Sequence, residues 1–213
     1  MGEALHVQAL LLDFNGTISD DEHLLCRIFM ELFADERPLS KDEYYERLAG
    51  LADREIVQLW LGRDDPALVE RKIERYGELA NGSTVTTDAR DAVEYAADRV
   101  PVAVVSGSAR AEIEPVLAKA GLLGSVTAIV ASGDIRRSKP DPEGYLIALH
   151  VLGVAAGQAA AVEDSEAGVE AAKAAGLYCA AVTTTLPAER LSAADEIAHR
   201  FDRDLIAGLL SRS

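Results

Sequence analysis

The stretch that decides the fold of this chain is Val7-Gln8-Ala9-Leu10-Leu11-Leu12-Asp13-Phe14-Asn15-Gly16-Thr17. A short apolar run ends there in an acid, an amide, a glycine and a hydroxyl, which predicts a strand buried on both faces of a parallel sheet. Such sheets bind ligands just beyond the carboxyl ends of their strands, so Asp13 stands where chemistry is expected. Gly16 lets the backbone turn sharply and approach a ligand. The simpler alternative is that Asp13 only caps the segment that follows.

Four helical patterns follow this strand without another strand between them, at residues 22–33, 42–48, 53–61 and 66–80. Ser40 and Glu43 form the capping-box pattern at the start of the second helix. We expect a small helical domain over residues 19–83, inserted after the first strand and placed over Asp13. An insertion in that position can exclude water and select substrates, whereas the alternative is a helical decoration without function.

From residue 84 onward, helical patterns alternate with short apolar segments. This alternation is typical of an α/β protein, in which a parallel sheet carries helices on both faces. The segments that we expect to form strands are residues 102–105, 126–130, 159–162 and 178–182.

Polar residues stand at the ends of these strands or in the loops after them: Ser106, Lys139 and the pair Glu163-Asp164. Taken singly, Ser106 suits a helix cap and Lys139 suits a solvated surface charge. The adjacent carboxylates repel each other after an apolar strand and therefore favour a bound cation over a capping role. Together with Asp13 they place a carboxylate, a hydroxyl, an ammonium and an acidic pair at one edge of the sheet.

The composition limits the partners of this protein. The chain has 213 residues, 49% of them hydrophobic and 27% charged, and a net charge of −15. This charge argues against nucleic acid and anionic membranes as partners, but one local cluster can still bind a phosphorylated metabolite. Cys26 and Cys179 are far apart and predict buried free thiols, and the N-terminus lacks a signal-peptide pattern. We therefore expect a cytoplasmic protein.

Four segments resemble, in the same order, the four motifs of the haloacid dehalogenase superfamily. They are Asp13-Phe14-Asn15-Gly16-Thr17, Val104-Val105-Ser106-Gly107-Ser108, Lys139-Pro140-Asp141-Pro142 and Glu163-Asp164-Ser165-x-x-Gly168. Within the superfamily, the chain is most similar to the phosphatases and β-phosphoglucomutases that carry a helical cap after the first strand. The resemblance implies a Rossmann-like three-layer α/β/α core of residues 1–18 and 84–213, with residues 19–83 as the cap.

The resemblance also implies a role for each motif residue. Asp13 would attack a phosphoryl group and become an aspartyl-phosphate. Mg²⁺ would bind Asp13, the backbone carbonyl of Asn15 and Asp164, with Glu163 bound directly or through water. Ser106 and Lys139 would hold the phosphoryl oxygens, which is the positive environment that phosphoryl transfer requires. The substrate-binding residues implied by the same motifs are Gly16, Thr17 and Gly107.

Asn15 departs from the family pattern, in which phosphatases have a second aspartate at this position. That aspartate protonates the leaving alcohol and then deprotonates the attacking water, and an amide has no titratable proton to give. Its loss costs about 10²–10⁴-fold in rate. Three explanations stay open: an enzyme whose proton comes from elsewhere or is not needed, a ligand-binding protein without turnover, and a substitution introduced to trap the enzyme.

The cap suggests how the substrate is selected. Arg54 lies about one position later than the arginine with which the phosphoglucomutases grip a second phosphate. Lys72, with Tyr76, is similar to the family's cap lysine, although an exposed helix charge is an equal alternative. A monophosphorylated substrate therefore fits better than a bisphosphate, and mutase activity is not expected. The residue-50 loop offers no lysine for phosphonatase chemistry, and a metal-free dehalogenase would leave Glu163 and Asp164 unexplained.

These observations predict a monomeric, Mg²⁺-dependent phosphohydrolase that acts on a small phosphomonoester through an aspartyl-phosphate. The alternative is a non-hydrolytic protein that binds a phosphorylated metabolite as a sensor or partner. Turnover of phosphorylated metabolites in the presence of Mg²⁺ distinguishes the two.

Overall fold

The fold is built on a six-stranded parallel sheet with the strand order β3-β2-β1-β4-β5-β6. The computed structural model describes residues 6–80 and 82–212, so residues 1–5, 81 and 213 of the predicted domains lie outside the described residues. The strands are β1 (Ala9–Leu12), β2 (Val102–Val105), β3 (Ala128–Val130), β4 (Ala159–Glu163), β5 (Tyr178–Val182) and β6 (Glu196–Ala198). β6 was not predicted, because its three residues carry too short a pattern.

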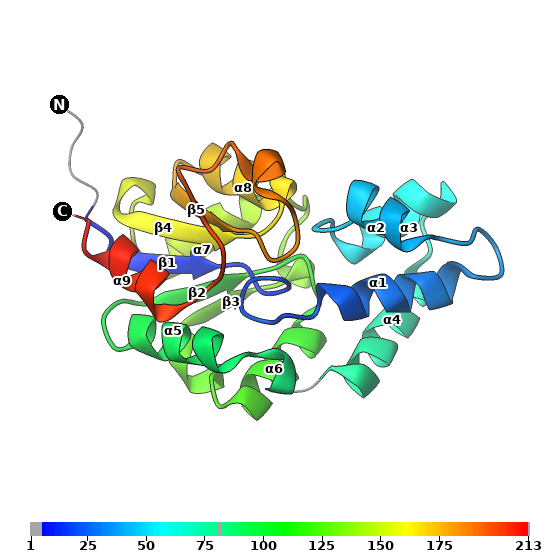
Figure 1. Ribbon diagram of the computed structural model, residues 1–213, viewed down its shortest axis with the longest axis horizontal. Coiled ribbons are helices and arrows are strands. Elements are labelled where there is room, and N and C mark those ends of the chain that lie inside the picture. The colour runs from blue at the N-terminus through cyan, green and yellow to red at the C-terminus, as the bar shows by residue number, and fades with distance from the viewer. Residues whose placement is uncertain (1–5, 81, 213) are drawn as a thin grey trace.

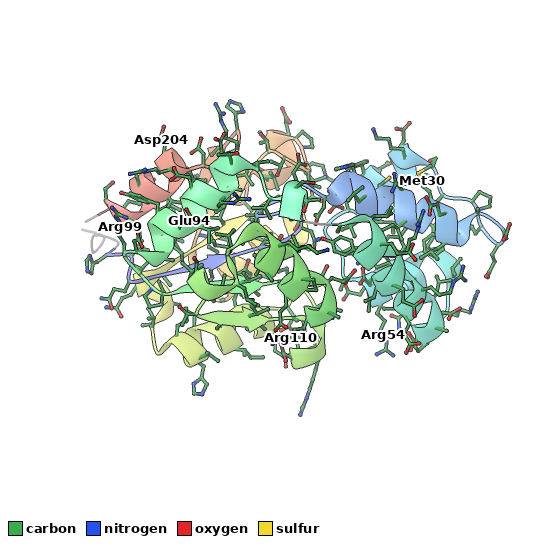
Figure 2. The ribbon with its side chains drawn as sticks, turned by 90° about the horizontal axis from the view of Figure 1, so that it is seen from below. Met30, Arg54, Glu94, Arg99, Arg110 and Asp204 are labelled. Atoms are coloured by element: carbon green, nitrogen blue, oxygen red, sulfur yellow. The ribbon has the colours of Figure 1, made fainter. Side chains whose placement is uncertain are left out.

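The sheet separates two apolar layers, and β1 contributes to both. Leu10 and Leu12 pack into one cluster, whereas Ala9 and Leu11 face the other, as the alternation of side chains along a strand requires. Helices α5 (Thr87–Ala97), α6 (Arg110–Ala120) and α9 (Arg203–Leu210) cover the first face, which Figure 2 shows from below. Helices α7 (Glu143–Leu152) and α8 (Glu166–Ala174) cover the second face. The prediction of a Rossmann-like three-layer α/β/α core is confirmed.

Among the described residues, four α-helices lie between β1 and α5: α1 (Glu22–Phe33), α2 (Lys41–Arg47), α3 (Asp53–Leu61) and α4 (Pro66–Leu79). Figure 1 shows them beyond the carboxyl end of β1. The predicted capping box of α2 is present, with Ser40 and Glu43 bonded to each other's backbone. An aromatic cluster fills the space between these helices, in which Phe33 stacks on Phe29 and on Trp60. Burial of these large rings holds the four short helices together.

The strand order places the centre of the sheet at a topological switch point. From β1 the chain proceeds to β2 and β3 on one side, and it then crosses to β4, β5 and β6 on the other. β1 and β4 are neighbours, but the next strands, β2 and β5, lie on opposite sides of this pair. The loops after β1 and β4 therefore run in opposite directions and leave a crevice between them. No helix among the described residues is long and apolar enough to cross a membrane.

Candidate active site

The loop after β1 is fixed against the end of β4. The Asp13 amide donates to the Val162 carbonyl at 3.0 Å, which continues the parallel pairing one residue beyond the strand. Gly16 has φ +75°, and a Cβ atom there would lie 1.9 Å from Oδ2 of Asp164. Only glycine therefore allows the loop to turn so close to the second acid.

Lys139 connects the acidic groups of the two strands. Its Nζ lies 2.5 Å from Oδ1 of Asp13 and 2.6 Å from Oε1 of Glu163, and it donates to the Val105 carbonyl at 2.9 Å. Burial alone would lower the pKa of Lys139, but the charges of Asp13 and Glu163 raise it above the usual value. Lys139 is thus a permanent cation beside Asp13, and the alternative of a solvated surface charge is wrong.

Glu163 is fully buried, and both of its carboxylate oxygens are already engaged. Oε1 accepts hydrogen bonds from Lys139 at 2.6 Å and from the Tyr145 hydroxyl at 2.5 Å. Oε2 accepts the Asp164 amide at 3.3 Å and the Ser165 hydroxyl at 3.4 Å. These contacts orient Lys139 and leave Glu163 less available as a direct metal ligand than Asp13 or Asp164.

Three carboxylates gather here against one ammonium group. Asp13, Glu163 and Asp164 each offer an oxygen, and these oxygens all lie within 4.8 Å of one another. Burial raises the pKa of Asp13 to about 8, although Lys139 opposes the shift. Burial and the charges of Asp13 and Glu163 raise the pKa of Asp164 well above its usual value. A divalent cation with a preference for oxygen ligands fits this site, because it would compensate the excess negative charge.

Ser106 and Ser108 follow β2 on the opposite side of Asp13. The Ser106 hydroxyl accepts the Ser108 amide at 3.1 Å and donates to Oδ1 of Asn15 at 3.4 Å. Ser108 donates to the same Asn15 oxygen at 2.7 Å. The start of α6 follows directly, so the positive end of its dipole lies near this loop. The loop can therefore present a hydroxyl and backbone amides to an anion.

The amide group of Asn15 is held at both ends. Its Nδ2 donates to both carboxylate oxygens of Asp21 at 3.2 Å, while its Oδ1 faces the two serines. Asp21 is fully buried and also accepts a hydrogen bond from the Tyr76 hydroxyl of α4. A carboxylate at position 15 would meet the carboxylate of Asp21 with no cation between them. The amide of Asn15 therefore suits this position, because its Nδ2 can donate to the Asp21 carboxylate.

One cavity brings together most of the predicted site residues. Gly16, Thr17 and Glu163 are buried but are not among its lining residues. The Thr17 hydroxyl is buried without a hydrogen-bond partner among the described residues. The predicted residues that line the cavity are Asp13, Asn15, Ser106, Gly107, Lys139 and Asp164.

Lys72 is fully buried, and the alternative of an exposed helix charge is wrong. Its Nζ lies 2.8 Å and 3.0 Å from the two carboxylate oxygens of Asp53 and 2.8 Å from Oε1 of Glu112. Asp53 belongs to α3 and lines the cavity, whereas Glu112 belongs to α6. Lys72 itself belongs to α4, so its ion pairs connect α3 and α4 to α6, which packs against the sheet.

Arg54 lies apart from Asp13, on the outer surface of α3. Its side chain is 68% exposed and forms an ion pair with Asp64, and Figure 2 shows it at the edge of the helices that follow β1. It lines a more open groove together with Arg136 and Arg137. An exposed arginine there can contact only a part of a substrate that extends out of the cavity.

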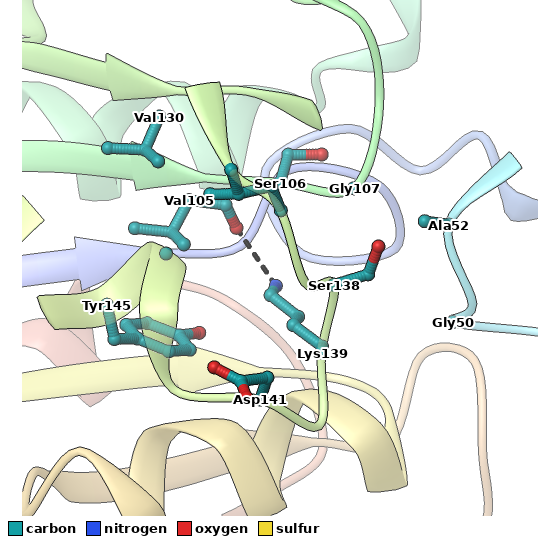
Figure 3. A pocket seen from close by; sticks show the side chains of 12 residues that line it. Gly50, Ala52, Val105, Ser106, Gly107, Val130, Ser138, Lys139, Asp141 and Tyr145 are labelled. Carbon is teal, nitrogen blue, oxygen red and sulfur yellow. Dashed lines mark hydrogen bonds between the residues drawn. The ribbon is translucent and has the colours of Figure 1, made fainter. Parts of the chain in front are cut away.

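A second, mostly apolar cavity adjoins the first and shares Gly50, Ser106, Gly107 and Lys139 with it. Figure 3 shows Lys139 reaching toward the Val105 carbonyl, with Ser106 beyond that carbonyl and the segment of Gly50 and Ala52 at the right of the view. A Cβ atom on Gly50 would lie 2.3 Å from Cβ of Ser165. The loop between α2 and α3 thus touches the loop after β4, and the cavity is covered from this side.

Sequence reasoning missed several residues of the cavity. Asp21 and Glu22 stand at the start of the helix predicted at residues 22–33, where negative charge is common. The structure buries both of them, and Glu22 lines the cavity and accepts a hydrogen bond from the Tyr44 hydroxyl at 2.8 Å. Neither position carries a sequence signal that separates a buried acid from a solvated one.

Comparison with known sequences and structures gives consistent matches over most of the chain. A family model described as haloacid dehalogenase-like hydrolase matches residues 10–182. Validoxylamine A 7'-phosphate phosphatase of Streptomyces hygroscopicus subsp. limoneus is 32% identical over 192 residues, which cover 87% of this chain and 90% of that protein. Fructose-1-phosphate phosphatase of Escherichia coli K12 is 29% identical and covers 79% of this chain and 92% of its own length.

A solved structure agrees with these sequence matches. Mutant CbbY from Rhodobacter sphaeroides, in complex with xylulose-(1,5)bisphosphate, superposes with a TM-score of 0.84 and 27% identity. The superposition covers 95% of this chain and 99% of that protein, so it includes both the sheet and the helices after β1.

Proposed function

Because this chain belongs to the haloacid dehalogenase-like hydrolase family and is a phosphatase-like hydrolase, we propose that it hydrolyses a small sugar phosphomonoester with the help of Mg²⁺. The relatives described above are named for phosphatases of phosphorylated sugars or sugar-like compounds, which supports this substrate class. The observation that carries the proposal is the contact of Asp13 with Lys139 in one cavity with Ser106 and Asp164.

Asp13 is the nucleophile in this proposal. One of its carboxylate oxygens attacks phosphorus, the bond from phosphorus to the leaving oxygen breaks, and an aspartyl-phosphate forms. Lys139 positions Asp13 and favours its ionised form against the effect of burial, since its Nζ lies 2.5 Å from the carboxylate. Ser106 and the amides at the start of α6 bind phosphoryl oxygens on the other side.

Mg²⁺ would be held by Asp13, Asp164 and the backbone carbonyl of Asn15, and Glu163 would lie next to these ligands. When bound, the cation neutralises part of the charge on the carboxylates and on the phosphoryl oxygens. Glu163 would then mainly position Lys139 and Tyr145, because it already accepts a hydrogen bond from each of them.

Residues 19–83 form the cap in this proposal, and residues 1–18 and 84–213 form the catalytic core. The contact of Gly50 with Ser165 supports a cap that covers the phosphoryl site and excludes water from it. In this proposal Lys72 connects cap and core instead of binding the substrate, because its ion pairs with Asp53 and Glu112 support that role. Arg54 would lie near the outer part of the substrate. The monomeric state and the cytoplasmic location rest on composition and resemblance.

The test is release of inorganic phosphate from a panel of phosphorylated sugars, with Mg²⁺ and with excess chelator. We expect release that requires Mg²⁺ and that disappears in the variant Asp13→Asn. Saturable binding of the same compounds without phosphate release would support the metabolite-binding alternative instead. Release that is unaffected by the chelator would contradict the metal-dependent mechanism.

A further inference from the structure

We infer that Glu22 is the general acid and base of this site and supplies the carboxyl group that position 15 lacks. The inference rests on the proposed phosphohydrolase function. Glu22 is the first residue of α1, and its side chain lines the cavity that also contains Asp13, Asn15 and Asp164. It is 6% exposed, so it faces the cavity and the protein with little contact with bulk solvent.

The other acids of the cavity are already committed to other contacts. Among the described residues, the carboxylates that line it are Asp13, Glu22, Asp53 and Asp164. Asp13 and Asp164 belong to the proposed nucleophile and metal site. Asp53 holds Lys72 with both of its oxygens. Glu22 takes part in none of the ion pairs found among the described residues, so it is the cavity acid that is free to exchange a proton.

Asp21 is a less suitable proton donor although it is close to Asn15. It is fully buried and is not among the residues that line the cavity. Its oxygens accept the Asn15 amide and the Tyr76 hydroxyl, which fixes it behind Asn15. Glu22 is held by two groups, the Tyr44 hydroxyl at 2.8 Å and the Gly50 amide, whereas Asp21 is held by Asn15, Tyr76 and Ser19.

The surroundings of Glu22 suit a group that both gives and takes a proton. Burial raises its pKa to about 7, and the hydrogen bond from Tyr44 only partly opposes this. General acid–base catalysis is most effective when the pKa lies near the working pH. The titratable and charged groups that interact electrostatically with Glu22 are Asp13, Asp21, Cys26, Tyr44, Tyr45, Lys72 and Asp164, and the Gly50 amide donates to it. Asp53 lines the same cavity.

Each half of the reaction then has a balanced proton transfer. When Asp13 attacks phosphorus and the bond to the leaving oxygen breaks, the proton of the Glu22 carboxyl moves to that oxygen and an alcohol leaves. In the second half, a water oxygen attacks phosphorus and the bond to Asp13 breaks. One proton of that water moves to Glu22, which restores its acid form, and inorganic phosphate is released.

The test compares Glu22→Gln with the unmodified protein on two leaving groups. The probes are p-nitrophenyl phosphate and the sugar phosphate that the panel shows to be turned over fastest. We expect kcat on the sugar phosphate to fall by about 10²–10⁴-fold, because its alkoxide leaving group needs a proton. On p-nitrophenyl phosphate, the burst of p-nitrophenol should keep its rate within about fivefold and be followed by slow turnover, because the second half still lacks its base.

Two controls separate this outcome from structural damage. Glu31→Gln removes an exposed acid from the same helix and should leave both activities unchanged. In the unmodified protein, the phosphorylation rate with the sugar phosphate should fall as pH rises above about 7, whereas the p-nitrophenol burst should not. This pH comparison needs no variant and therefore holds even if Glu22→Gln does not fold.

A p-nitrophenol burst that Glu22→Gln slows as much as it slows phosphorylation by the sugar phosphate would overturn the role of Glu22. So would an unchanged kcat on the sugar phosphate, or identical pH profiles of the phosphorylation rate for the two leaving groups. Failure of the unmodified protein to release phosphate from any probe would instead contradict the proposed function.

Discussion

Lys139 and Lys72 each place an ammonium group between two buried carboxylates, but they lie in different parts of the molecule. Lys139 contacts Asp13 and Glu163 at the end of the sheet. Lys72 contacts Asp53 and Glu112 between the helices that follow β1 and α6. The Lys72 side chain is fully buried, while that of Lys139 is 10% exposed toward the cavity.

The two clusters differ in what surrounds the acids. Asp164 adds a third carboxylate beside Lys139, so that cluster keeps an excess of negative charge next to a cavity. Beside Lys72, the second oxygen of Glu112 accepts the Ala109 amide at 3.0 Å at the start of α6. The first cluster therefore suits the binding of a cation and a phosphoryl group, and the second suits a fixed connection between helices. Two clusters with the same kind of ion pair therefore suit different roles, because they differ in net charge and in access to the cavity.

The largest expected effect is the loss of turnover in Asp13→Asn. Removal of a catalytic nucleophile costs on the order of 10⁶-fold in other hydrolases, and we expect a loss of similar size here. Mg²⁺ should also bind more weakly, because a charged ligand becomes neutral. Phosphate release and calorimetric Mg²⁺ titration measure the two effects. The fold should tolerate the change because it relieves carboxylate repulsion, and unchanged hydrolysis would contradict the mechanism.

Lys72→Met tests the second cluster. It leaves Asp53 and Glu112 buried without their cation, which should destabilise the protein by about 3–5 kcal/mol. Denaturant unfolding measures this, and Arg75→Met is the matched control on the same helix. Arg75 forms only exposed ion pairs, which contribute about 0–1 kcal/mol. Equal stability of the two variants would show that the Lys72 cluster does not hold the helices together.

The two clusters should also respond differently to pH and Mg²⁺. The folded pKa of Asp13 is raised to about 8, above the usual value of about 3.9 in an unfolded chain. Its contribution to stability is therefore present at low pH and is lost as pH rises through about 8. In chelator, we expect a lower Tm at pH 8 than at pH 5.5.

Mg²⁺ should restore part of that loss by replacing the proton at Asp13. Burial also raises the pKa of Asp53, to about 6, so ionisation of Asp53 contributes to the lower Tm at pH 8. Mg²⁺ should not restore this part of the Tm. Each kcal/mol corresponds to about 2–4 °C in a chain of this size. A Tm at pH 8 that does not change with Mg²⁺ would contradict the assignment of the metal site to the first cluster.

Asn15→Asp should have the smallest effect. It places a carboxylate against Asp21, whose oxygens lie 3.2 Å from the Asn15 amide nitrogen, and no lysine stands between them. We expect less than a tenfold gain on sugar phosphates, because Asp21 restrains the new acid and because Glu22 already supplies the proton in our proposal. An acid that filled an empty general acid position would give about 10²–10⁴-fold. The double variant Asn15→Asp/Asp21→Ser removes the repulsion and serves as the comparison. A large gain in the single variant would show that Asp21 does not restrain position 15.

The sequence predicted the parallel sheet, its helical layers and the set of motif residues around Asp13. This was possible because buried strands leave continuous apolar runs, and because polar residues at their ends meet at one edge of the sheet. The short strand β6 was missed, since three residues cannot establish a pattern.

The roles of the remaining acids and of Lys72 could not be predicted. Glu22 and Lys72 lie in amphipathic helices, and Asp21 directly precedes one; charged residues at such positions usually face solvent. Their burial depends on how the helices after β1 pack against the sheet layer, and a helical pattern does not specify this. Asn15 was recognised as a departure from the family, but its partner Asp21 became evident only from the hydrogen bonds between them.

The most direct test of the account is to look for phosphate on Asp13. The protein is mixed with p-nitrophenyl phosphate and Mg²⁺, quenched in acid within milliseconds, and analysed by mass spectrometry of its peptides. We expect a phosphoryl group on the peptide that contains Asp13, which is absent when chelator replaces Mg²⁺ and absent in Asp13→Asn. Release of p-nitrophenol without any phosphorylated Asp13, or with the label on another residue, would contradict the proposal that Asp13 is the nucleophile.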